Sequence, residues 1–245
     1  MLKNNIVLNL LVFAKKVEQG ATQQELIIEA SKLGFDKIEV RREYFKNLEQ
    51  ELPSIKKTAI DLDIEIFYSV PEGIFVKEKL NPNLKTHLEE AKRMGASHIK
   101  WNIGDYTSGL SLEKLKEFSN SSLIELNIEN DQTESAGSIS AILEFMKDVR
   151  KEEISIGFVY DLGNWRFVEE NEIEAAKKLG DFVRFIHMKD ITYLDGKPQT
   201  VGLGQGEINW QEALKTLPSG LPIAIEYPTF SDQEILEAKS TLQEM

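Results

Sequence analysis

The sequence predicts an α/β fold, a closed (β/α)8 TIM barrel that forms a single domain over residues 1–245. Strand-like and helix-like segments alternate along the chain in eight units, and such alternation implies parallel strands joined by right-handed crossovers. Eight units in 245 residues match the usual size of this barrel. A doubly wound open sheet is the alternative, but no glycine-rich phosphate turn follows the first strand-like segment.

The strand-like segments are short runs of apolar or alternating residues, as in strands of a parallel sheet. They cover residues 6–13, 37–42, 64–70, 98–104, 123–130, 155–163, 183–190 and 222–227. Each is followed by a segment whose apolar residues have helical spacing. These helices cover residues 22–33, 45–63, 81–94, 112–119, 139–151, 169–179, 209–217 and 231–243. No linker or shift in composition interrupts the series, which favours one domain.

Residues at the expected helix ends support these boundaries. Thr22 and Glu25 have the spacing of a capping box. Asn81 is placed to cap the helix that Gly95 ends. Proline is tolerated in the first turn of a helix and not in its interior, so Pro53 suggests that the helix over residues 45–63 starts late.

Composition limits the classes of function. Hydrophobic residues make up 41% and charged residues 29%, which is a globular balance. The net charge of −12 argues against a nucleic-acid partner. No apolar run reaches the roughly 18 residues that span a bilayer. The amino-terminal M-L-K-N-N-I-V-L-N-L-L-V-F contains Asn9 and no cleavage site follows it, so we expect a strand there, no membrane association and a cytoplasmic location.

Four polar side chains stand at the carboxyl ends of the last four strand-like segments, where such barrels carry their active sites. Alternation along each strand turns all four inward: Glu129, Asp161, His187 and Glu226. Three carboxylates this close would repel one another and would be costly to bury. One divalent metal ion removes that cost, and the absence of cysteine leaves only nitrogen and oxygen ligands, which suit Mn²⁺, Mg²⁺, Co²⁺ or Zn²⁺. The alternative is four separate salt-bridged residues.

Five short motifs carry a resemblance to a known family. They are L-N-I-E-N-D, F-V-Y-D-L-G-N-W, F-I-H-M-K-D, G-L-G-Q-G-E-I-N-W and I-A-I-E-Y. Together they resemble the xylose isomerase-like TIM barrels, the sugar and sugar-phosphate isomerases and epimerases that are also similar to the endonuclease IV group (AP endonuclease family 2). The resemblance runs from G-F-D-K-I-E-V to the last strand and is loose in the amino-terminal half. It implies that Glu129, Asp161, His187 and Glu226 bind one metal ion, with Glu129 and Glu226 as the acid/base pair.

The chain departs from the family pattern at several positions. Many members have D-x-G-H on the sixth strand, where this chain ends the motif with Asn164. Endonuclease IV-like enzymes need further histidines for a three-zinc cluster. Here the third and fourth strands end in Tyr68 and in Trp101-Asn102, and no D-x-H follows His187. A trinuclear cluster and DNA repair are therefore disfavoured.

Further polar residues near the barrel mouth are expected to bind substrate. They are Lys189, Asn164, Glu39, Arg41, Asn102 and Tyr68. Lys189 has an alternative as the partner of Asp190 in a rim salt bridge. Glu39 and Arg41 share the inward face of the second strand, where they either pair with each other or orient the substrate; Asn9 is also expected to face inward.

The remaining candidates are weaker. Gly202, Gly204 and Gly206 lie in the loop after the seventh strand, where barrels often bind phosphate, but G-x-G-x-G alone carries little weight. His87 stands in a charged helix and is expected to be solvated. His98 begins a strand, far from the catalytic rim, and receives no role.

The resemblance implies a divalent-metal-dependent isomerase or epimerase. Its substrate would be a ketose, a ketose phosphate or a related polyol ketone, and proton transfer would pass through a metal-stabilised enediolate. A metal-dependent dehydratase of an inosose-like ketone and a non-catalytic sugar-binding barrel remain as alternatives. The expected partner is a small sugar or sugar phosphate, with no nucleic acid and no membrane. A homo-oligomer is compatible with the resemblance, since family members are often dimers or tetramers.

Overall fold

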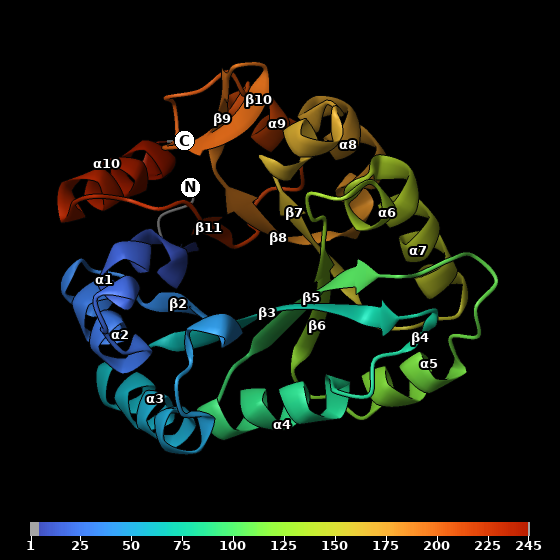
Figure 1. The fold of residues 1–245 in the computed structure, drawn as a ribbon, viewed down its shortest axis with the longest axis horizontal. Helices are drawn as coiled ribbons and strands as arrows, with labels where there is room; N and C mark the ends of the chain where they lie inside the picture. Colours follow the sequence, from blue (N-terminus) through green and yellow to red (C-terminus); the bar gives the residue numbers. More distant parts are fainter. Residues whose placement is uncertain (1–4, 245) are drawn as a thin grey trace.

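A closed barrel of parallel strands forms the centre of the molecule in this computed structural model, which describes residues 5–244 (Figure 1). Strand β1 pairs in parallel with both β2 and β11, so the sheet closes on itself. Within the described residues the barrel has eight strands: β1 (Ile6–Asn9), β2 (Lys37–Arg41), β3 (Glu65–Val76), β5 (His98–Gly104), β6 (Glu125–Glu129), β7 (Gly157–Asp161), β8 (Val183–Met188) and β11 (Ile223–Ile225). The predicted (β/α)8 barrel is confirmed.

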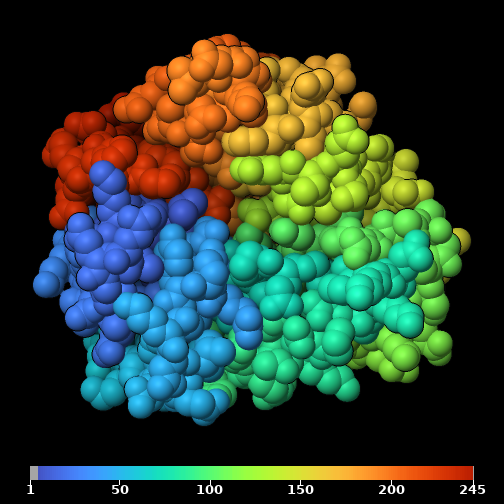
Figure 2. Space-filling model, in the orientation of Figure 1, coloured from blue at the N-terminus to red at the C-terminus, as the bar shows by residue number. Residues whose placement is uncertain are grey.

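Helices surround the barrel in the order of the sequence. They are α1 (Ala14–Glu18), α2 (Gln23–Lys32), α3 (Leu48–Leu62), α4 (Leu84–Met94), α5 (Glu113–Asn120), α6 (Glu134–Gly137), α7 (Ile139–Lys151), α8 (Glu172–Leu179), α9 (Trp210–Thr216) and α10 (Asp232–Gln243). Short 3-10 helices supplement them: η1 (Leu10–Phe13), η2 (Arg42–Tyr44), η3 (Asn164–Val168) and η4 (Gly180–Phe182). Figure 2 shows the surface divided into sectors that follow the chain around the molecule. No helix of the described chain is long and apolar enough to cross a bilayer.

The hydrophobic core has two parts. The larger part lies between the barrel and the helices. A smaller cluster of inward-facing residues fills the barrel itself: Val7, Phe67, Val159, Phe185 and Ala224. Phe185 stands two residues before His187 on β8, and the ring centroids of the two lie 4.7 Å apart. This apolar layer therefore forms a floor beneath the polar end of the barrel.

Helix ends follow the predictions in part. Thr22 forms the predicted capping box with Glu25 at the start of α2. The N-cap position of helix α4 is Asn83, whose side chain makes no capping bond, and not the predicted Asn81. The Asn81 side chain instead accepts a hydrogen bond from the Asn83 N–H at 2.9 Å. The expectation that Pro53 stands in a first turn is wrong, because α3 begins at Leu48 and carries Pro53 in its interior.

The first predicted strand is too long. Residues 10–13 form η1 instead, because Asn9 Oδ1 accepts the backbone N–H of Leu11 at 2.8 Å and turns the chain away from the sheet. Two hairpins were also missed. Strand β3 runs on to Val76 and pairs with β4 (Lys79–Leu80), and β9 (Asp190–Leu194) pairs with β10 (Lys197–Val201) after the seventh barrel strand.

Strands β3 and β5 approach closely at two glycines. Gly104 has a φ of +69°, and a Cβ there would collide with the carbonyl oxygen of Phe75 and with Gly73 Cα. The pairing of β3 with β5 shifts register between Ser69 and Gly73, so the contact lies where β3 leaves the regular barrel.

We predict that Gly104→Ala destabilises the protein by about 3 kcal/mol, because the left-handed conformation costs an L-residue about 1–2 kcal/mol and the collision adds about 1–3 kcal/mol. Gly109→Ala is the matched control, since Gly109 has a φ of +90° with nothing near its would-be Cβ. Urea unfolding measures both variants. Equal losses of stability would contradict a role for the close approach.

Candidate active site

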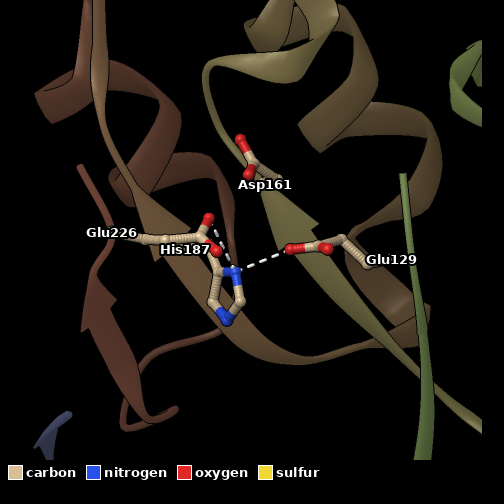
Figure 3. A group of neighbouring side chains, drawn as sticks. All are labelled: Glu129, Asp161, His187 and Glu226. Atoms are coloured by element: carbon tan, nitrogen blue, oxygen red, sulfur yellow. Dashed lines mark hydrogen bonds and ion pairs between the residues drawn. The ribbon is translucent and has the colours of Figure 1, made fainter. Parts of the chain in front are cut away.

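The four predicted strand-end residues meet at one point. One ligand atom from each of Glu129, Asp161, His187 and Glu226 lies within 4.8 Å of those of the other three (Figure 3). Strand register explains the meeting, because Asp161 and Ala224 are both opposite His187 in the sheet and Glu226 follows Ala224 by two residues. All four side chains are buried.

His187 lies at the centre of three carboxylates. Its Nδ1 is 2.6 Å from Glu129 Oε1 and 3.1 Å from Glu226 Oε2, and its Nε2 is 2.9 Å from Glu39 Oε2. Burial alone would lower the pKa of His187, but Glu39, Glu226 and Glu129 outweigh burial and hold it well above its ordinary value. The imidazole is thus fixed from both sides, and Nδ1 is the nitrogen directed at the cluster.

Three cations pair with the three carboxylates of the cluster. Lys100 Nζ contacts Glu129 Oε2. Lys189 Nζ lies 2.6 Å from Asp161 Oδ2, and Arg41 Nη1 lies 2.8 Å from Glu226 Oε1.

These pairs set the protonation of the carboxylates unequally. Burial raises the pKa of Glu129, but the ammonium of Lys100 reverses this and brings it to about 2. Burial also raises the pKa of Glu226, and His187, Lys189 and Arg41 together hold it well below its ordinary value. Burial of Asp161 dominates over Lys189 and raises its pKa to about 7. Both glutamates are therefore held ionised, whereas Lys189 only partly compensates the cost of burying a negative charge on Asp161.

The four side chains fit a divalent cation. Glu129 Oε1 is buried without a hydrogen-bond partner and faces the cluster. Asp161 Oδ1 accepts the backbone N–H groups of Gly163 and Asn164 at 3.0 and 3.1 Å, which leaves Oδ2 directed at the cluster. Three carboxylate oxygens and one imidazole nitrogen form a donor set suited to Mn²⁺, Mg²⁺, Co²⁺ or Zn²⁺.

Glu39 and Arg41 both belong to the site, but they do not pair with each other. Glu39 contacts His187, and Arg41 bonds to Glu226 and to Glu43. Asn9 joins them, since its Nδ2 donates to Glu39 Oε2 at 2.7 Å and to Glu226 Oε1 at 3.2 Å. The two predicted substrate residues on β2 thus contact two members of the cluster, His187 and Glu226.

The other predicted substrate residues lie in different surroundings. Lys189 reaches into the cluster, bonding to Asp161 rather than to Asp190. Asn102 is half-buried and shares the face of β5 that carries Lys100. Asn164 is buried behind Asp161, where its amide donates to the Asn130 carbonyl and accepts from Gln132.

Tyr68 does not line the barrel mouth as predicted. Its neighbour Phe67 occupies the barrel interior, so alternation turns Tyr68 outward. There its hydroxyl donates to Glu90 Oε2 of α4 at 2.6 Å. The structure therefore separates Tyr68 from the other predicted site residues.

Lys100 is the residue of the site that sequence reasoning missed. It stands on β5 between His98 and Asn102, on the same inward face, and only 6% of it is exposed. Strand parity alone could have indicated it, because Asn102 was predicted to face inward. A lysine buried below the rim requires a partner, and Glu129 becomes its neighbour only through the pairing of β5 with β6.

The glycine loop after β8 binds a carboxylate of its own chain. Asp190 Oδ2 accepts the N–H groups of Gly204 and Gly206 at 3.1 and 3.0 Å, and its Oδ1 accepts those of Ile191 and Ile208 at 2.8 and 3.0 Å. The amides that a phosphate would need are thus engaged. The weak prediction of a phosphate site on these N–H groups does not fit the structure.

The two other histidines lie outside the site. The prediction of a solvated His87 is wrong, because this residue of α4 is fully buried against β3 and β5. Trp101 Nε1 donates to its Nδ1 at 3.1 Å, and Glu72 Oε1 lies 3.2 Å from its Nε2. His98 lies at the opposite end of the barrel, near Glu65 and Glu125.

Fold and site together define a TIM barrel with a buried carboxylate–histidine cluster at the carboxyl ends of its strands. The family described as "Xylose isomerase-like TIM barrel" matches residues 27–245, and the chain belongs to this family. The comparison with curated proteins gave no match.

Solved structures show the same fold at low sequence identity. D-psicose 3-epimerase from Clostridium cellulolyticum H10 is 15% identical, with a TM-score of 0.70 and 98% of each chain covered. The probable 3-DHS dehydratase AsbF from Bacillus anthracis is 16% identical, with a TM-score of 0.72, over 98% of this chain and 99% of that one. The IolI protein, described with a bound zinc atom, is 16% identical, with a TM-score of 0.69, over 98% and 96%.

We predict that Asp190→Asn loosens the loop over residues 202–208. The amide can accept through one atom only, so the N–H groups of Gly204 and Gly206 lose their acceptor, at a cost of about 1–3 kcal/mol. Hydrogen exchange followed by mass spectrometry should show faster exchange in this loop. Asp195→Asn is the control, because Asp195 is exposed at the tip of the β9–β10 hairpin. Unchanged exchange in Asp190→Asn would contradict the anchoring role.

Proposed function

We propose that this protein is a divalent-metal-dependent isomerase or epimerase of a ketose, a ketose phosphate or a related polyol ketone. The observation that supports this proposal most directly is the placement of Glu129 and Glu226. They approach His187 from opposite sides of the cluster (Figure 3), and each directs one oxygen toward its Nδ1. A carboxylate that removes a proton from a substrate carbon becomes the acid that can return it to the next carbon, and a glutamate on the other side can, once protonated, deliver a proton to the opposite face.

The cations behind the glutamates keep them in the state that a base needs. Lys100 holds the rear oxygen of Glu129, and Arg41 with Asn9 holds the rear oxygen of Glu226. Each glutamate is thus ionised, oriented and left with one oxygen free to face a substrate. Asp161 and His187 are proposed as metal ligands only. A bound divalent cation would supply the Lewis acidity that stabilises negative charge on an enediolate oxygen of the substrate.

A dehydratase is the second candidate, favoured by the similarity to the probable 3-DHS dehydratase. The same carboxylates would serve: the one that removes the proton would become a carboxylic acid, and its proton would leave with the departing hydroxyl group as water. Product analysis separates the two reactions, because loss of water creates a conjugated chromophore, whereas isomerisation preserves the mass.

We predict that Glu129→Gln and Glu226→Gln each lower kcat by about 10²–10⁴-fold, the usual contribution of a general acid or base. A panel of ketoses, ketose phosphates and inosose, with and without chelator, provides the assay. Circular dichroism should show an unchanged fold. Glu125→Gln is the matched control, since Glu125 lies on the same strand near its opposite end, and it should retain activity. Full activity in both glutamate variants would refute the acid/base assignment.

We also predict that the purified protein binds one divalent metal ion per chain and that Asp161→Asn binds it at least about 10–100-fold more weakly, since even residues that only support metal ligands contribute this much. Titration calorimetry with Mn²⁺ and elemental analysis measure both. Asp195→Asn should bind the metal like the unaltered protein. A protein that takes up no divalent metal would overturn the proposed function.

A further inference from the structure

The backbone of Asp161 is held by a side chain at the point where the neighbouring strand has already ended. Strand β6 ends at Glu129. The side chain of the next residue, Asn130, bonds to the last residue of β7: its Nδ2 donates to the Asp161 carbonyl at 3.0 Å, and its Oδ1 accepts the Asp161 N–H at 2.9 Å. A carboxamide has a donor and an acceptor, as a peptide group does, so Asn130 adds one further rung to the pairing of β6 with β7.

The pairing of β7 with β8 shows why this rung is needed. On that side the Leu162 N–H donates to the His187 carbonyl at 3.0 Å. Backbone groups point alternately to either side along a strand, so those of Asp161 point the other way, toward β6. Asp161 and Asn130 are both fully buried, so no water could replace the carboxamide.

Asn164 closes this contact into a ring. Its Nδ2 donates to the Asn130 carbonyl at 2.8 Å, and its backbone N–H donates to Asp161 Oδ1 at 3.1 Å. The Gly163 N–H donates to the same carboxylate oxygen at 3.0 Å. Asn130 thus fixes the backbone of Asp161, and the turn that follows fixes its carboxylate, so that Oδ2 faces the cluster.

We propose that Asn130 is a positioning residue for the metal centre, which holds Asp161 in its ligand position before a cation binds. The inference rests on the proposed metal-dependent function and adds a residue to which that function gives no role. Asn130 acts through Asp161, because both polar atoms of its side chain are engaged by the Asp161 backbone. A ligand that is already ordered binds a cation more tightly than one that must be ordered on binding, since ordering costs conformational entropy.

Asn130→Ala removes both bonds and should bind Mn²⁺ about 10–100-fold more weakly than the unaltered protein, the usual loss for a residue that supports a metal ligand. Titration calorimetry measures the affinity. Asn171→Ala is the matched control, because the Asn171 side chain also bonds to two backbone groups, the N–H groups of Ile173 and Glu174 at the start of α8. This variant should unfold at a lower urea concentration, as expected for the loss of a helix cap, and should bind Mn²⁺ unchanged.

Two further measurements separate positioning from a general loss of stability. Hydrogen exchange of the metal-free protein should become faster over residues 160–164 in Asn130→Ala and should stay unchanged there in Asn171→Ala. The visible absorption of bound Co²⁺ depends on the geometry of its ligands, so the spectrum should change in Asn130→Ala alone.

A second variant covers the case in which Asn130→Ala does not fold. Asn164→Ala removes the closing bond to the Asn130 carbonyl and keeps the backbone N–H that donates to Asp161. It should weaken Mn²⁺ binding by about threefold to tenfold, as expected for one hydrogen bond.

Unchanged Mn²⁺ affinity in the Asn130 or Asn164 variant, or unchanged exchange over residues 160–164 in Asn130→Ala, would overturn the proposal. Equal losses of affinity in Asn130→Ala and Asn171→Ala would also overturn it, since both would then reflect stability alone. An unaltered protein that binds no divalent metal would refute the proposed function and this role together. Metal binding that depends on Asn130, without turnover of any ketose, would refute the proposed reaction alone.

Discussion

The pairing of buried carboxylates with cations is the interaction on which the site depends. Ionised carboxylates in a barrel interior cost several kcal/mol each unless a partner compensates them. The Arg41–Glu226 pair illustrates how the fold meets this demand, because it links β2 to the residue after β11 across β1. Asn9 on β1 bonds to Glu39 and Glu226 in the same place. Charge compensation therefore requires the closed barrel, and the site forms only where β1 pairs with both of its neighbours.

Strand parity accounts for what could be predicted. The positions of Glu129, Asp161, His187 and Glu226 follow from alternation along four strands and from the common rim of parallel strands, and both properties are local to each strand. Lys100 escaped prediction because its partner lies on another strand, and only the register of β5 against β6 brings the two together. Tyr68 shows the reverse case. It was expected to line the barrel mouth, but it lies on the outward face of β3 and its hydroxyl bonds to helix α4.

The segments that sequence patterns described poorly are those controlled by side chain–backbone hydrogen bonds. The apolar run after Asn9 looks like a continued strand, but one bond from Asn9 Oδ1 to the Leu11 N–H begins a 3-10 helix. Asp190 likewise organises a loop whose glycines resemble a phosphate site. In both segments a single polar side chain decides the backbone path, and hydrophobic periodicity carries no information about it. The β9–β10 hairpin also lay beyond this reasoning, because its strands are short and largely exposed.

The same cations that compensate the glutamates would also limit their strength as bases in the proposed reaction. A carboxylate whose pKa is held near 2 by an adjacent ammonium removes a proton from carbon only if the carbanion is stabilised elsewhere. The barrel interior cannot supply this through Glu129 or Glu226, since both are already committed to cations. In the proposed reaction this stabilisation would arise at the substrate oxygens, where a bound divalent cation would supply Lewis acidity. In the proposed reaction, weak and firmly oriented bases would therefore favour transition states in which negative charge leaves the C–H bond and spreads onto oxygen.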